Sequence, residues 1–195
     1  GSYGEFTASA QFFGINVFFV KTSINDDFKY TPSNLDESLK NVKNPVVFLN
    51  APIINPTGSV YSRGELCELL KVIEAHKGAV ILDIAFFALE YATDIQKGCF
   101  SKMLDHGLEW TIMGSISKLF AAGGLRFGFA ASNTKWMKDA FSKNTDAYPH
   151  KTIQFTARRL FEAFNNKEAS LVAELNEQRL LLKKRAEELS GILEE

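Results

Sequence analysis

Short apolar segments alternate with helical segments along most of this 195-residue chain, and that alternation restricts the possible folds more than any other feature. The apolar segments are residues 16–22, 45–50, 79–83, 110–113 and 127–130. The first is built largely of β-branched and aromatic residues, which is typical of a strand. Strands that are apolar throughout and are separated by helices indicate a mostly parallel sheet covered by helices on both faces. We therefore predict an α/β fold with a central, mostly parallel sheet.

Capping signals mark the ends of two predicted helices. Ser62 and Glu65 have the spacing of a capping box, and apolar residues recur on one face of the segment that follows them. We expect Gly78 to close this helix. A first helix begins near the start of the chain, where Ser2 lies three residues before an acidic residue, and Gly14 can end it.

From Asn133 onward the pattern is helical. Residues 152–164 place apolar side chains on one side, and leucines recur at helical spacing along 171–193. Two weaker helices are predicted near 35–42 and 100–106. We therefore expect the strands to be followed by a second, helical region.

Charge and cysteine usage exclude several classes of protein. The 22 basic residues nearly cancel the 23 acidic ones, so no basic excess points to nucleic acid. Cys67 and Cys99 have neither metal-site spacing nor the density of a disulfide scaffold, which indicates a reducing cytoplasm. No apolar run approaches the roughly 20 residues that span a bilayer, and the start of the chain lacks the pattern of a signal peptide. The three histidines also lack metal-ligand spacing. We therefore expect a cytoplasmic protein that binds neither nucleic acid, membranes nor a metal.

Polar residues follow three consecutive predicted strands. Asn55-Pro56-Thr57-Gly58 follows the strand that ends at Asn50, Asp83 ends the next strand, and Ser115-Ile116-Ser117-Lys118 follows the third. Ligands of an open parallel sheet bind outside the carboxyl ends of its strands, so these groups should face one crevice. An amide, a carboxylate and a lysine suit a cofactor that carries a phenolate, a ring nitrogen and an aldehyde.

An anion site is predicted beside the lysine. Arg126 follows a glycine pair at 123–124, and the planar fork of an arginine matches a phosphate that small hydroxyls can share. Ser115 and Ser117 supply such hydroxyls. Glycines let the backbone pass close to a ligand.

These motifs together resemble the fold-type I, class I/II aminotransferases, which depend on pyridoxal 5'-phosphate. The resemblance rests on Asn55-Pro56-Thr57-Gly58, on Asp83, and on Ser115-x-Ser117-Lys118 with Arg126 eight residues after the lysine. It implies that Lys118 is the catalytic residue, which forms the internal aldimine and moves a proton at the substrate Cα. It implies that Asp83 keeps the pyridine nitrogen protonated and that Asn55 donates to the phenolic oxygen.

The resemblance implies further cofactor-binding residues. Ser115 and Arg126 would bind the phosphate, with Ser117 as a helper. Tyr3 falls where the family stacks an aromatic ring on the cofactor. Phe86 departs from the family, which commonly has a tyrosine at this position as a second donor to the phenolic oxygen.

The resemblance also implies an activity and a domain organisation. The expected reaction transfers the amino group of an amino acid to a 2-oxo acid, in a protein that forms a homodimer. Residues 1–145 would form the cofactor-binding large domain, incomplete at its amino end. Residues 146–195 would form linker helices and the start of an incomplete small domain. We therefore expect the chain to be part of a protein of about twice this length.

Other interpretations remain open beside this one. The same fold supports decarboxylases and lyases, and a catalytically silent fragment could serve as an association module. Taken alone, Lys118 could be a solvated lysine, Asp83 a capping residue, Asn55 part of a β-turn, and Arg126 the partner of a surface carboxylate. Ser115-x-x-Lys118 also matches serine penicillin-recognising enzymes, but their Ser-Asp-Asn and Lys-Thr-Gly elements are missing.

Overall fold

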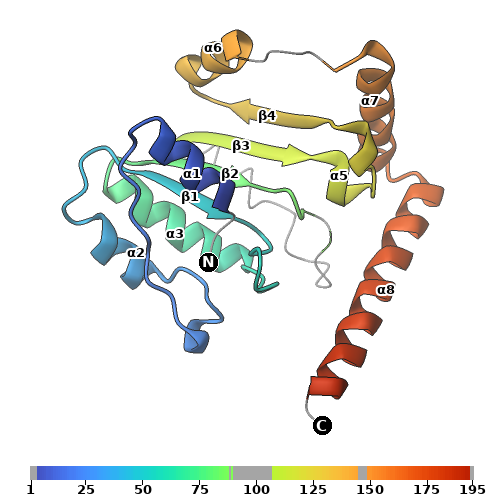
Figure 1. Cartoon of the computed structure of the whole chain (residues 1–195), viewed down its shortest axis with the longest axis horizontal. Coiled ribbons are helices and arrows are strands. Elements are labelled where there is room, and N and C mark those ends of the chain that lie inside the picture. The colour runs from blue at the N-terminus through green and yellow to red at the C-terminus, as the bar shows by residue number, and fades with distance from the viewer. Residues whose placement is uncertain (1–3, 88, 90–106, 145–148, 194–195) are drawn as a thin grey trace.

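The computed structural model describes residues 4–87, 89, 107–144 and 149–193 (Figure 1). The cap predicted at Ser2, the stacking residue Tyr3 and the helix predicted near 100–106 lie outside the described residues. The predicted domain boundary after residue 145 also falls outside them and stays a prediction.

One four-stranded sheet forms the centre of the structure (Figure 1). Its strands are β1 (Val46–Asn50), β2 (Ala79–Asp83), β3 (Glu109–Ser115) and β4 (Gly128–Ser132), in that spatial order. The first three strands are parallel, and β4 is antiparallel to β3. The predicted mostly parallel sheet is therefore confirmed, and four of the five apolar segments are strands.

The prediction of a strand at 16–22 is wrong. This segment is irregular and pairs with no strand in the described part of the chain. Phe18 and Phe19 expose 69% and 67% of their surface. The strand preference of aromatic and β-branched residues depends on packing against a neighbouring strand, and this segment has no such partner here, although Val20 packs against the core.

Helices precede, separate and follow the strands, as expected for an α/β chain. The α-helices are α1 (Gly4–Phe12), α2 (Pro32–Leu39), α3 (Arg63–Ala75), α5 (Ile116–Leu119), α6 (Lys135–Asn144), α7 (Lys151–Asn165) and α8 (Ala169–Leu193). Two short 3₁₀ helices, η1 (Ile24–Asp26) and η2 (Gly123–Leu125), lie in the connections. Across the described ranges, no helix is both long and apolar enough to cross a membrane.

Both faces of the sheet carry helices, as predicted. On one face, alternate strand residues are buried against α2 and α3. The buried residues of this core include Leu35, Leu39, Val47, Leu49, Leu66, Leu69, Leu70, Ile73, Val80 and Leu82. On the other face, the ring of Phe48 contacts that of Phe6 in α1, with ring centroids 4.4 Å apart. Successive side chains of a strand point to opposite faces, so β1 packs on both sides.

The capping box of α3 is confirmed. The Ser62 hydroxyl accepts from the Glu65 backbone N–H at 3.2 Å, and the Glu65 carboxylate accepts from the Ser62 N–H at 2.6 Å. The helix ends before Gly78, but the left-handed residue is Lys77, with φ of 51°. Gly78 serves close packing instead, because a Cβ there would lie 3.0 Å from two atoms of Pro45. Glycine at this position lets α3 turn directly into β2.

A second, smaller cluster joins the later helices to the sheet region. Leu119 of α5 and Leu175 of α8 are buried in it. Phe120 packs edge-on against Phe161 and Phe164 of α7, with ring centroids 5.6 and 6.1 Å apart. This cluster holds the backbone of α5 against two longer helices.

Candidate functional site

The strand register brings most of the predicted site residues to one edge of the sheet (Figure 1). Asn50, the last residue of β1, pairs with Asp83, the last residue of β2. Ser115, the last residue of β3, pairs with Gly128, the first residue of β4. Because β4 is antiparallel, the loop that carries Arg126 re-enters the sheet at the same edge. The carboxyl ends of three strands and this loop therefore meet, as the sequence predicts.

Asp83 is fixed by hydrogen bonds on both sides. The Ala51 N–H donates to the Asp83 carbonyl at 3.1 Å, and the Ile84 N–H donates to the Met113 carbonyl at 2.8 Å, so its backbone is held between β1 and β3. Its carboxylate Oδ2 accepts from the Asn50 amide at 2.7 Å, and Oδ1 accepts from the Ala85 N–H at 3.0 Å. Asp83 is half-buried, and the position of its carboxylate is defined by both contacts.

Burial raises the pKa of the Asp83 carboxyl above its ordinary value of 3.8, and the hydrogen bonds from Ala85 and Asn50 partly oppose this shift. At a pH between 3.8 and the raised pKa, the Asp83 carboxyl is protonated in the folded chain and ionised in the unfolded chain. The folded state then binds more protons, so its stability falls as the pH rises through that window.

Replacing Asp83 by Asn will remove this pH dependence, because an amide does not titrate. The free energy of unfolding of the wild type, minus that of Asp83→Asn, should therefore decrease as the pH rises just above 3.8, and then become constant. Denaturant unfolding of both proteins over a series of pH values measures this difference. A difference that grows with pH in that window would contradict the assigned direction.

Lys118 lies on a short helix whose backbone is anchored on both sides. The Ser115 hydroxyl caps α5 by accepting from the Ser117 N–H at 3.2 Å, and the Ile116 N–H donates to the Phe127 carbonyl at 3.2 Å. Ile116 and Leu119 are buried, whereas Lys118 between them is exposed. The structure thus combines a held backbone with an accessible amine.

Arg126 is exposed and adopts the left-handed conformation, with φ of 49°. Its Nη1 donates to the Gly123 carbonyl at 3.4 Å. Arg126 could instead pair with a surface carboxylate, but it forms no ion pair with any residue that the structure describes. Its guanidinium retains donors for an anion.

Asn55 lies in a tight turn between β1 and α3, as the sequence predicts. The Gly58 N–H donates to the Ile54 carbonyl at 2.8 Å, and the Ile54 N–H donates to the Ser59 carbonyl at 2.9 Å. Gly58 has φ of 75°, a conformation that favours glycine. Asn55 is half-buried in this turn.

Asn50 is the residue of this edge that the sequence interpretation missed. The available signal was a polar residue at the last position of an apolar strand. Its meaning depends on the register, because only the pairing of β1 with β2 places it beside Asp83. Among the described residues no group of three or more acidic, histidine or cysteine side chains could hold a metal ion.

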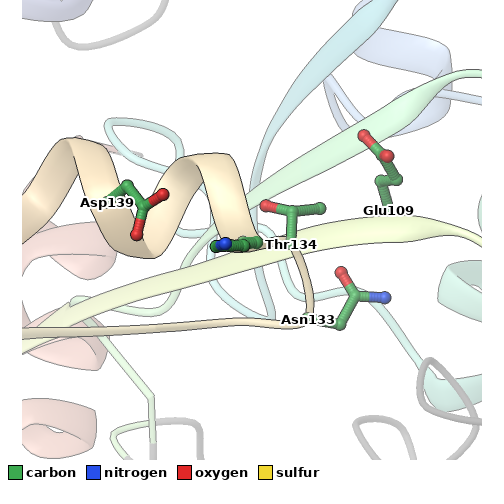
Figure 2. A pocket seen from close by; sticks show the side chains of 5 residues that line it. Glu109, Asn133, Thr134 and Asp139 are labelled. Atoms are coloured by element: carbon green, nitrogen blue, oxygen red, sulfur yellow. The ribbon is translucent and has the colours of Figure 1, made fainter.

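A polar hollow of about 590 Å³ lies at the opposite edge of the sheet (Figure 2). It is lined by Glu109, Asn133, Thr134, Lys135 and Asp139. The Asn133 side chain is occupied there, because it donates to the Leu108 carbonyl at 2.8 Å and accepts from the Trp110 N–H at 2.9 Å. None of the predicted site residues lines this hollow, which lies at the start of β3 and the end of β4.

Comparison with known proteins identifies the family. The family model described as aminotransferase class I and II matches residues 1–195. The chain belongs to this family. The resemblance inferred from Asn55, Asp83, Lys118 and Arg126 is therefore confirmed at the level of the family.

Individual relatives differ in their named activities. Methionine S-methyltransferase of Zea mays is 32% identical over 202 aligned residues, which cover 100% of this chain and 18% of that protein. Histidinol-phosphate aminotransferase 1 of Haemophilus influenzae is 32% identical over 148 residues, which cover 76% of this chain and 39% of that protein. The chain thus spans less than half the length of these relatives.

The solved structure of a PLP-bound C-S lyase from Staphylococcus hominis superimposes with a TM-score of 0.79 and 18% identity. The match covers 100% of this chain and 48% of the lyase chain. This likeness confirms the predicted fold class, that of pyridoxal-phosphate-dependent transferases.

Proposed function

We propose that this chain carries the pyridoxal-phosphate-binding region of an enzyme that transfers an amino group from an amino acid to a 2-oxo acid, with Lys118 as the catalytic residue. One observation carries the proposal. In a chain of the aminotransferase family, Asp83, the Ser115–Lys118 segment and Arg126 lie at the same edge of one sheet. The PLP-bound state of the structurally similar lyase and the aminotransferase relative support the cofactor and the reaction class.

The described residues fit this cofactor chemically. A carboxylate has about four acceptor positions, and Asp83 uses two of them for Asn50 and Ala85, so it retains capacity for a ring N–H. Lys118 is exposed and can reach an aldehyde in solution. Arg126 keeps donors for a phosphate. Tyr3, proposed to stack on the ring, lies outside the described residues.

Each residue then has a defined task in the reaction. Pyridoxal phosphate, when bound, supplies a ring that accepts electrons from the substrate. The Lys118 amine would hold the cofactor aldehyde and would move a proton at the substrate Cα. Asp83 would keep the ring nitrogen protonated, and Asn55 would donate to the phenolic oxygen. Ser115, Ser117 and Arg126 would hold the phosphate.

Reductive trapping tests the proposal. The chain is mixed with pyridoxal phosphate and treated with borohydride, which reduces a lysine–cofactor C=N bond to a stable amine. Peptide mass spectrometry then locates the label. We expect it on the peptide that contains Lys118, at far higher occupancy than on exposed lysines such as Lys138. Uniform labelling of exposed lysines would contradict a specific site. If the label is specific to Lys118, amino-group transfer is measured next.

A second candidate is a catalytically silent association module. The match to methionine S-methyltransferase over the whole chain favours it, because that protein is named for a different transfer reaction. Phe86, half-buried in the turn after β2, also lacks the hydroxyl of the family's tyrosine. A folded chain that gives no specific Lys118 label supports this candidate.

A third candidate is a decarboxylase or lyase on the same fold, which the likeness to the C-S lyase permits. It shares the Lys118 label but releases carbon dioxide and an amine, or a thiol, ammonia and a 2-oxo acid, in place of exchanging an amino group. Product analysis with an amino acid and a 2-oxo acid separates these reactions. The homodimer and the cytoplasmic location stay predictions, which size measurement and cell fractionation test.

A further inference from the structure

The side chain of Asn50 makes a direct contact within the proposed site. Asn50 ends β1 and is the register partner of Asp83. Its Nδ2 donates to the Asp83 Oδ2 at 2.7 Å, and both side chains are partly buried. Hydrogen bonds from an amide to a carboxylate are stronger than those between neutral groups. This contact therefore restricts the Asp83 side chain more than ordinary packing does.

Two donors from different elements hold the two carboxylate oxygens. Asn50 holds Oδ2 from β1, and the Ala85 N–H holds Oδ1 from the turn after β2. Rotation of the carboxylate about its Cβ–Cγ bond breaks both contacts at once. With both donors present, the remaining acceptor positions of Asp83 point in fixed directions.

We propose that Asn50 is a positioning residue, whose amide orients the Asp83 carboxylate toward the ring nitrogen of the bound cofactor. The proposal rests on the proposed function, since it needs a cofactor with a basic ring nitrogen. Asn50 acts through Asp83 and has no assigned contact with the cofactor. Its amide also favours the anionic form of the carboxylate, which is the form that pairs with a protonated ring nitrogen.

Two cofactor compounds separate this role from general support of the site. The first is pyridoxal 5'-phosphate, and the second is its 1-deaza analogue, in which carbon replaces the ring nitrogen. Asn50→Leu removes the donor at similar side-chain volume, and Asn50→Ala removes it without adding bulk. Absorbance titration gives the dissociation constant of each compound for the wild type and each variant. We expect about tenfold weaker binding of pyridoxal phosphate and less than about twofold change for the analogue, because only the former engages Asp83.

Asn133→Leu is the matched control. Asn133 also joins neighbouring strand residues through its amide, but at the opposite edge of the sheet. Its replacement removes a comparable structural amide without touching Asp83. We expect the dissociation constants of both compounds to stay within about twofold of the wild type.

A titration without cofactor tests the contact independently. In ¹³C NMR, the pKa of the Asp83 carboxyl should be higher in Asn50→Leu and Asn50→Ala than in the wild type, and unchanged in Asn133→Leu. Circular dichroism establishes that each variant is folded, and Asn50→Ala replaces Asn50→Leu if the latter is not.

Three outcomes overturn the proposal, and they differ from one another. Equal weakening of both compounds means that Asn50 supports the site without acting through the ring nitrogen. If loss of the Asn50 amide does not change the Asp83 pKa, the hydrogen bond between the two side chains is not formed in solution. A folded wild type that binds neither compound contradicts the proposed function, and the orienting role of Asn50 falls with it.

Discussion

Replacing Lys118 by alanine will abolish covalent attachment of pyridoxal phosphate while leaving the fold intact. Lys118 is exposed between the buried residues Ile116 and Leu119, so truncation of its side chain removes no core contact. Without the amine, no C=N bond to the cofactor aldehyde can form at this position. The visible absorption band of the lysine-bound cofactor and the borohydride label should both be lost completely.

Two further variants make this experiment specific. Lys118→Arg keeps a positive charge but supplies no amine that condenses with the aldehyde, so it should behave like Lys118→Ala. Lys138→Ala removes an exposed lysine on α6 and should retain both the band and the label. A band that persists in Lys118→Ala with the same intensity would move the attachment point to another lysine and refute the assigned catalytic residue.

Replacing Leu69 by alanine will cause a large loss of stability. Leu69 lies on α3, exposes 0% of its surface, and belongs to the core between α2, α3 and the sheet. Leu→Ala substitutions at fully buried sites cost about 2–5 kcal/mol through lost transfer energy and the cavity left behind. Domains have a total stability of about 5–15 kcal/mol, so the variant loses a large share of it. Urea unfolding monitored by circular dichroism measures the change.

Leu180→Ala is the control of identical chemistry for this substitution. Leu180 lies on α8 and exposes 68% of its surface, so its truncation should change the free energy of unfolding by less than about 0.5 kcal/mol. Similar losses for the two variants would mean that Leu180 is covered in solution. A small loss for Leu69→Ala would mean that the α3 core adapts to the cavity, contrary to the expectation from its burial.

The central sheet could be predicted because its strands carry their own signals. Segments such as 79–83 are apolar throughout, and the helix between β1 and β2 begins with a capping box whose two hydrogen bonds are local. The segment at 16–22 is also rich in aromatic and β-branched residues, but no strand pairs with it in the described part of the chain. Its structure depends on a partner, and partners are not encoded in the composition of a segment. Lys77 likewise adopts the left-handed conformation expected of glycine, because Gly78 is required for close packing.

The candidate site divides in the same way. Asn55, Asp83, Ser115, Lys118 and Arg126 could be selected from the sequence because each lies in a short motif at or near the end of a recognisable strand. Asn50 could not, because its contact with Asp83 arises from the register between β1 and β2, and residues 51–78 separate these two strands in the sequence. Local sequence patterns therefore identify the residues of the motifs, whereas Asn50 can be identified only from the structure.

The reversed direction of β4 has a consequence for the geometry of the proposed site. Residues 116–127 connect Ser115, the last residue of β3, to Gly128, the first residue of β4. Because Ser115 and Gly128 are register partners, hydrogen bonds between β3 and β4 hold the two ends of this loop together. The separation between the amine and the guanidinium is then set within a single short loop. Because α7 and α8 pack on Leu119 and Phe120 beside this loop, redesign of α6, which contributes no residue to that described cluster, is the change expected to leave the separation unaltered.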